Sequence, residues 1–535
     1  MTASCSVARR HGARRWPVWG AVLSAALAVA PLSLGLSAAV QAQSTLPALG
    51  DAAAADLTVG AERRLGDRIM REIRRDPDWL DDPLLQDYLN SLWQPLLVAA
   101  RARGDLSDDQ QTHFALQAFL VRDRSINAFA LPGGYVGVHL GLIALTSSRD
   151  ELAAVLAHEL SHITQRHIAR NMASSRRQSM LSVASMIVGI LAASRSQNVD
   201  AANAVIVGGQ AAAVQGQLNF SRDMEREADR VGFGVLDAAG FAPDGMASMF
   251  DQMQFASRLN DSGQFPYLRT HPLTSERIAE ARGRLGTGAD RKAAAASAQW
   301  LHAAMQGRAR AWMDGRTQTL TRLSGGGVPT AAAAAQTPQA LATACAAAIA
   351  ATRLKDWRVA DAALARARAL ATPQGEAVLR AVQVLQVESL LERGQAVEAA
   401  RVLSIGVLDG SRAGLLLGAR LAALPGSEAA LVSRTREELQ TWVVLHADDA
   451  GAWLALAQVN ERLGVPLAAL RAHAEARFAQ GDLSGAVDRL RAGQRLARSS
   501  GAVESMEGVI IESRLKVIEQ QRRVEMEQER NGSQN

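Results

Sequence analysis

The spacing of apolar residues changes along the first half of the chain. Residues 57–105 carry apolar side chains at helical spacing, and Asp81-Asp82-Pro83 is a typical helix start. Residues His113–Val121 and Ile126–Ala130 then predict strands, and Tyr135–His139 alternates as a third. Strand-like stretches are few elsewhere, so we expect a mainly α fold with a small β-sheet. An exposed strand could pair with an extended peptide, although a plain structural hairpin fits the pattern equally well.

The helix predicted directly after these strands carries the first candidate chemistry. Ser147 or Ser148 caps it, acidic residues follow in its first turn, and an apolar run leads to His158-Glu159-Leu160-Ser161-His162. At about 100° per residue, His158 and His162 lie on one face and can bind one metal ion. Glu159 lies beside that face, where a carboxylate can accept a proton from water without being a ligand. The alternative is a helix with two ordinary histidines.

A catalytic zinc site needs a third protein ligand, and the candidate lies 63 residues beyond His162. Glu225 and Asp229 are four residues apart on one predicted helix face, so Glu225 can bind the metal while Asp229 accepts the second N–H of a ligating imidazole. By the same geometry Glu227 faces the opposite side, and His167 lies about 140° from His162 and is expected to be solvated. Taken alone, the pattern also fits a charged, solvated helix.

Composition and charge narrow the function. Residues 1–42 begin with a basic head, continue as an apolar stretch and end with Val40-Gln41-Ala42, which predicts a secretory signal peptide, with an uncleaved membrane anchor as the alternative. This segment holds four of the 58 basic residues and no acid, which leaves 54 basic against 53 acidic residues. The net charge therefore gives no support to nucleic-acid binding. Cys345 remains alone after cleavage, so we expect no internal disulfide.

The second half predicts a separate helical domain. Residues 314–337 contain a glycine run and an alanine run and are interpreted as a linker. Over 338–518 a turn signal followed by a small residue recurs, which favours a short, degenerate tetratricopeptide-like α-solenoid over a plain helical bundle. The charged tail 519–535 is expected to be disordered. The recurring pairs are Gly394 and Ala399, Gly464 and Ala469, Gly481 and Ala486, and Lys355 and Ala360.

The two charged motifs carry a resemblance. His158-Glu159-x-x-His162, followed by Ser221-Arg222-x-x-Glu225-x-x-Ala228-Asp229-x-x-Gly232 and preceded by Asn127-Ala128-Phe129-Ala130-x-Pro132-Gly133-Gly134, resembles the zinc metallopeptidases of the CAAX prenyl protease and HtpX family. The layout is similar to its periplasmic, BepA-like branch. The resemblance covers roughly residues 55–285. It implies a zincin-like domain over 43–313 that binds one Zn²⁺ through His158, His162 and Glu225, with Glu159 as the general base.

Two further groups follow in Arg269-Thr270-His271-Pro272-Leu273 and at Arg277. The resemblance implies that His271 occupies the open position of the metal as a fourth ligand and switch in a resting state. The alternative is an ordinary helix-entry loop. Arg277 either stabilises an oxyanion or, as we favour, pairs with Glu276 or Glu280.

The resemblance also implies a biological role. We expect a periplasmic zinc endopeptidase with chaperone-like activity, whose substrates are misfolded or stalled outer-membrane β-barrel proteins. The helical repeats would contact the β-barrel assembly machinery. Residues 180–217 are small and apolar, and we expect a mobile cover with peripheral membrane contact rather than core helices. The alternative function is a non-proteolytic assembly factor that binds clients through its repeats.

Overall fold

A computed structural model describes residues 57–174, 222–259, 265–285, 296–325, 336–404 and 410–532. The predicted signal peptide and the predicted cover at 180–217 lie outside these residues. Within the described ranges, no helix combines the length and the apolar character that crossing a membrane requires.

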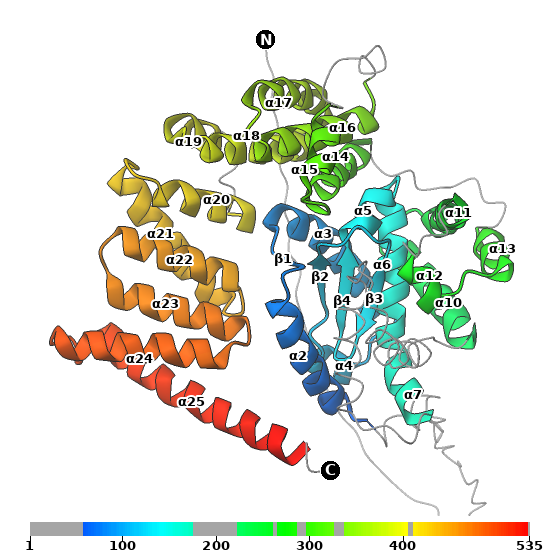
Figure 1. The fold of residues 1–535 in the computed structure, drawn as a ribbon. Coiled ribbons are helices and arrows are strands. Elements are labelled where there is room, and N and C mark those ends of the chain that lie inside the picture. Colours follow the sequence, from blue (N-terminus) through cyan, green and yellow to red (C-terminus); the bar gives the residue numbers. More distant parts are fainter. Residues whose placement is uncertain are drawn as a thin grey trace, which may run out of the picture. The chain divides into compact units, whose positions relative to one another are not determined.

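The N-terminal part contains a sheet surrounded by helices (Figure 1). Its elements are α2 (Val59–Arg75), β1 (Trp79–Leu80), α3 (Pro83–Ala102), α4 (Asp108–His113), β2 (Gln117–Val121), β3 (Ala128–Leu131), β4 (Tyr135–His139), α5 (Leu140–Leu145), α6 (Arg149–Thr164), α7 (His167–Ser174), α10 (Arg222–Ala238), α11 (Asp244–Leu259), α12 (Pro266–Thr270), α13 (Ser275–Arg284), α14 (Ala296–Trp312) and α15 (Thr317–Gly325).

The sheet has the strand order β1-β2-β4-β3. Strands β2 and β4 are parallel, with Phe119 opposite Gly137, whereas β1 and β3 pair antiparallel with their neighbours. The Phe129 ring covers Gly137 so closely that a larger residue would clash there. A Cβ added at Gly137 would lie 2.3 Å from the ring. Helix α6 packs on β3 and β4. The predicted mainly α class with a small sheet is therefore confirmed, although the sequence did not reveal β1.

The C-terminal part is entirely helical where it is described. Its elements are α16 (Pro338–Arg353), α17 (Trp357–Ala371), the 3₁₀ turn η2 (Thr372–Gln374), α18 (Glu376–Glu392), α19 (Ala396–Ser404), α20 (Arg412–Ala423), α21 (Ala429–Leu445), α22 (Ala450–Arg462), α23 (Pro466–Ala479), α24 (Leu483–Ser499) and α25 (Met506–Gly532). Helices adjacent in sequence pack against one another, as α22, α23, α24 and α25 do in Figure 1.

The recurring turn signal has a shared backbone conformation. Gly394, Gly464 and Gly481 each begin an interhelical turn with φ of +72°, +68° and +76°, and Lys355 adopts φ of +58° at the equivalent place. This left-handed conformation costs glycine little, which explains why glycine occupies three of the four turns. The paired alanines of the next helix are all buried, so a small residue permits close helix packing there.

Two segments differ from the sequence-based expectation. Helix α15 lies inside the predicted linker 314–337. Helix α25 extends across residues 519–532, where a disordered tail was predicted. The preceding turns anchor this helix, because Ile511, Leu515 and Ile518 pack in a cluster with α24. Within the charged end itself, Glu525 lies 3.7 Å from Arg71 of α2.

The tandem aspartates ahead of α3 join this helix to the C-terminal helices. Asp82 caps α3 by accepting from Leu85 N at 2.9 Å, and it also pairs with the buried Arg308 of α14 at 2.8 Å. Arg308 contacts Glu388 of α18 at 2.7 Å. Asp81 pairs with Arg412 of α20 at 2.6 Å. The same short segment therefore starts α3 and holds two arginines of later helices.

We expect Arg308→Met to destabilise the protein by about 3 kcal/mol or more, because removing one partner of a buried ion pair leaves the other charge without compensation. The shift of the urea unfolding midpoint measures this loss. The control Arg434→Met removes an exposed pair with Glu438 and should cost less than about 1 kcal/mol. Equal shifts of the urea midpoint for both variants would contradict a stabilising role for the buried ion pairs of Arg308.

A second test uses pH. Burial raises the pKa of Asp87 on α3 to about 6, against the lowering effects of Arg412 and of the Ala413 N–H. Because the folded protein then binds more protons at this group than the unfolded chain does, stability falls as pH rises from about 4 to about 6. Asp87→Asn should therefore raise the melting temperature at pH 7.5 but not at pH 4. Equal effects at both pH values would contradict this assignment.

Candidate metal centre

Helix α6 holds three of the predicted site residues in the interior. Ser148 caps it, as predicted, and its hydroxyl accepts from Glu151 N at 3.1 Å. Every residue from Asp150 to Thr164 is buried, including His158, Glu159 and His162. Burial on all sides explains why the helix lacks an amphipathic pattern. It also means that each of these polar side chains needs a partner inside the fold.

Helix α10 supplies those partners because it packs directly on α6. Gly232 faces the α6 backbone, and a Cβ added there would lie 3.1 Å from Ala157 O and 3.2 Å from His158 N. The absence of a side chain at this point lets the two helices approach closely. Glu225 and Asp229, two turns and one turn earlier on α10, are thereby buried beside the histidines.

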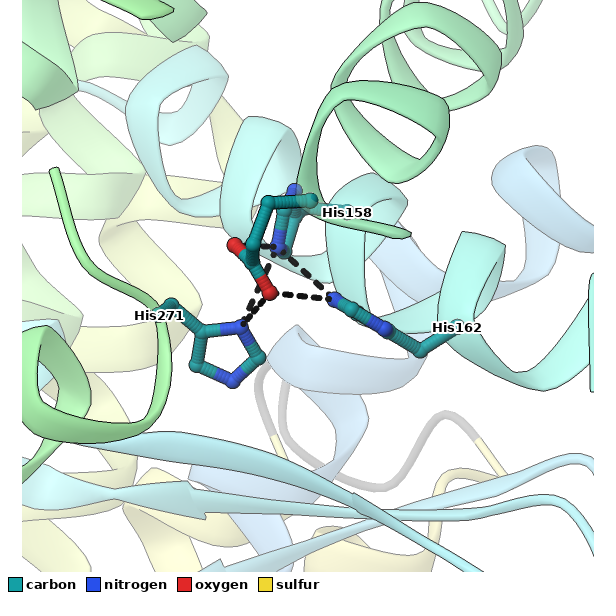
Figure 2. Close-up of side chains that lie close together, drawn as sticks. His158, His162 and His271 are labelled. Carbon is teal, nitrogen blue, oxygen red and sulfur yellow. Dashed lines mark hydrogen bonds and ion pairs between the residues drawn. The ribbon is translucent and has the colours of Figure 1, made fainter. Parts of the chain in front are cut away.

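Four side chains converge at this place (Figure 2). The Nε2 atoms of His158 and His162 are 3.0 Å apart, and each lies 3.5 Å from an oxygen of Glu225. Nδ1 of His271 lies 3.0 Å from Glu225 Oε1 and 3.4 Å from His158 Nε2. All four donor atoms lie within 4.8 Å of one another. The structure therefore brings together every ligand candidate that the sequence indicated, whereas His139 bonds Ser125.

The donor set fits zinc. Zinc binds imidazole nitrogen and carboxylate oxygen at about 2.0–2.2 Å in tetrahedral geometry, which places neighbouring ligand atoms about 3.4 Å apart. Five contacts among these residues span 3.0–3.5 Å, close to this spacing, and all four donor atoms lie within 4.8 Å of one another.

Asp229 and Arg277 support the cluster from the side. Asp229 Oδ1 lies 2.9 Å from His158 Nδ1, on the ring edge opposite the convergent nitrogen. Arg277 donates to both oxygens of Asp229 at 2.6 and 2.8 Å, and its Nη1 lies 2.8 Å from Glu225. The predicted structural role of Arg277 is consistent with these contacts, but the predicted partners are wrong. Glu276 and Glu280 pair with other arginines on the surface.

The electrostatics of the protein alone reflect this pairing. Burial would lower the pKa of His158, but the bonds to Asp229 and Glu225 outweigh it and raise the pKa to about 9. Burial would raise the pKa of Glu225, but the His271 charge and the bonds from His158 and His271 hold it far below its usual range. Burial, together with the neighbouring His158 charge, lowers the pKa of His162. Glu225 is thus ionised and ready to bind a cation.

Glu159 has the environment of a reactive group. Its carboxylate is fully buried, and neither oxygen makes a hydrogen bond within the described part of the chain. An unsatisfied buried carboxylate is costly and needs a functional explanation. Oε1 lies 3.7 Å from His271 Nε2, and the His271 ring stacks on Tyr267 with 4.6 Å between centroids.

The prediction that His167 is solvated is wrong. His167 is fully buried, with Nδ1 2.8 Å from His162 Nδ1, and its Nε2 lies 2.9 Å from Glu227. The helical projection failed because α6 ends at Thr164 and Arg166 adopts φ of +52°. A helix can end two residues after its last metal-facing position, and the lack of a glycine here left no local signal of the turn.

An HExxH helix beside a sheet, with a carboxylate from a later helix, defines the metallopeptidase class. Residues 89–285 match the model of peptidase family M48. This match agrees with the family resemblance that the motifs carry.

Curated relatives agree with this family. A putative beta-barrel assembly-enhancing protease of Vibrio cholerae is 38% identical over 245 residues, which are 45% of this chain and 47% of the relative. The beta-barrel assembly-enhancing protease of Escherichia coli is 37% identical over 262 residues, 48% of this chain and 50% of the relative. The mitochondrial metalloendopeptidase OMA1 of Schizosaccharomyces pombe is 28% identical over 223 residues, which are 42% of this chain and 60% of the relative. The chain spans about half the length of the assembly-enhancing proteases it matches.

Proposed function

We propose that this protein is a periplasmic zinc endopeptidase with chaperone-like activity in the quality control and assembly of outer-membrane β-barrel proteins. The observation that carries the enzymatic part is the convergence of His158, His162 and Glu225 on one point, with the unpartnered carboxylate of Glu159 beside it. The names of the relatives at 37–38% identity support the substrate class.

Each residue has a defined part in the proposed reaction. His158, His162 and Glu225 would hold one Zn²⁺, which supplies Lewis acidity to a peptide carbonyl and a water molecule. Glu159 would take the proton from the attacking water and deliver it to the leaving nitrogen, which a carboxylate without competing hydrogen bonds can do. Asp229 would fix the His158 ring, and Arg277 would hold Asp229 in turn.

His271 is proposed as a gate. Its Nδ1 reaches the donor cluster and its Nε2 lies 3.7 Å from Glu159, so the ring occupies the space that a substrate carbonyl and water need. His271 follows directly after the short α12, whose Tyr267 it stacks on. A change in this loop would remove the imidazole from the cluster and open the site.

The remaining parts of the proposal concern location and clients. The proposed signal peptide at 1–42 would direct export to the periplasm. The helical repeats would hold clients or the β-barrel assembly machinery, since stacked helix pairs present extended binding surfaces. Peripheral contact with the membrane through 180–217 is part of the same proposal.

Glu159→Gln tests the enzymatic part. We expect this variant to retain one zinc per chain and to cleave casein about 10²–10⁴ times more slowly, because the amide cannot accept the proton. Metal analysis and a fluorescent casein assay measure the two properties. Glu225→Ala is the comparison variant, which we expect to lose both zinc and casein cleavage.

The same Glu159→Gln protein separates the two candidate functions. If cells that carry it lose the quality control of outer-membrane proteins, proteolysis is the main activity. Fully normal envelope quality control with this variant would instead favour a non-proteolytic assembly factor that acts through the repeats.

His271→Ala tests the gate. Removing the imidazole should free the space beside Glu159, so we expect faster cleavage of casein at unchanged zinc content. The exposed His113, replaced by alanine, is the control. Cleavage by His271→Ala at or below the wild-type rate would argue against a gating role.

A further inference from the structure

A buried chain of hydrogen-bonding groups leads from the candidate metal centre to the far side of α10. His162 directs Nε2 toward the donor cluster, while its Nδ1 lies 2.8 Å from Nδ1 of His167. His167 Nε2 lies 2.9 Å from Glu227 Oε2. Both imidazoles are fully buried, and their rings meet edge to face with centroids 4.8 Å apart. Three residues therefore form one continuous path.

The backbone is built to place His167 there. Helix α6 ends at Thr164, and the left-handed conformation of Arg166 turns the chain so that His167 starts α7 and folds back on His162. The Arg166 guanidinium is held by Glu62 of α2 at 3.1 and 3.2 Å, and Glu62 is itself buried. A non-glycine residue at positive φ costs free energy, so the surrounding contacts must maintain this turn.

With both imidazoles neutral, the donors and acceptors of this path can be arranged in one way. A carboxylate only accepts, so Glu227 requires the proton of His167 on Nε2. Nδ1 of the neutral His167 is then an acceptor, and it takes the Nδ1 proton of His162. His162 is thereby left with a free lone pair on Nε2, the nitrogen that faces the cluster.

His158 has an equivalent arrangement. Its Nδ1 faces Asp229, so the lone pair of its Nε2 also points into the cluster. Both supporting carboxylates, Glu227 and Asp229, belong to α10, and so does Glu225. One helix thus provides a ligand candidate and an acceptor for each imidazole, but the acceptor for His162 acts through a second histidine.

We propose that His167 and Glu227 are positioning residues that fix the tautomer and ring orientation of His162 for zinc. This inference rests on the proposed zinc site. Arg170 contacts the same Glu227 oxygen at 2.7 Å, at the end of the path remote from His162. It offers a matched control.

The experiment measures zinc affinity by chelator competition on purified full-length protein, together with the absorption spectrum of the Co²⁺-substituted form. His167→Phe keeps a planar ring but has no acceptor, and Glu227→Leu removes the terminal acceptor. We expect both to bind zinc about 10–100 times more weakly than wild type and to shift the Co²⁺ bands. Glu227→Gln retains an acceptor oxygen and should recover most of the affinity, while Arg170→Met should bind like wild type. Circular dichroism of the metal-free variants checks that each is folded.

Two results would overturn the inference. The first is His167→Phe binding zinc as tightly as wild type with the same Co²⁺ spectrum. The second is Arg170→Met losing as much affinity as Glu227→Leu, which would indicate a purely structural contact between α7 and α10. A wild-type protein that binds no zinc would instead contradict the proposed function itself, so the two failures are distinguishable.

Discussion

The close packing of α10 on α6 is the constraint on which the site depends. At Gly232 the two backbones approach so closely that a Cβ would lie 3.1 Å from Ala157 O. A rigid helix held at this distance carries Glu225 and Asp229 to the histidines without help from a flexible loop. Ligands on packed helices keep their geometry better than ligands on loops, and a metal site needs that precision.

The same packing buries several carboxylates close together, and neighbouring side chains compensate most of their charge. Glu159, Glu225 and Asp229 are all nearly or fully buried within one small volume. Arg277, also buried, contacts two of them, and His158 contacts the same two carboxylates. Glu159 alone has no hydrogen bond within the described residues. The structure therefore satisfies the carboxylates that hold and orient ligands, and leaves the proposed base ready to react.

Much of this arrangement could be predicted from the sequence because it follows from regular helical periodicity. The relation of His158 to His162, and of Glu225 to Asp229, needs only intact helices. The tertiary approach of the two segments could not be derived from spacing and came from the family resemblance. The predictions that failed concern positions that regular helical periodicity does not describe. His167 was placed by extending α6 past its end, and no glycine marks the turn at Arg166. The partners of Arg277 were assigned to neighbours on its own helix, whereas burial selects the carboxylates of α10.

The central claim is that a carboxylate from α10 completes a zinc site begun by two imidazoles of α6. Anomalous diffraction at the zinc edge from crystals of the zinc-loaded protein tests it most directly. The account predicts a single peak about 2.0–2.2 Å from His158 Nε2, His162 Nε2 and a Glu225 oxygen. A peak that lies elsewhere, or one with Glu225 more than about 4 Å away, would contradict it.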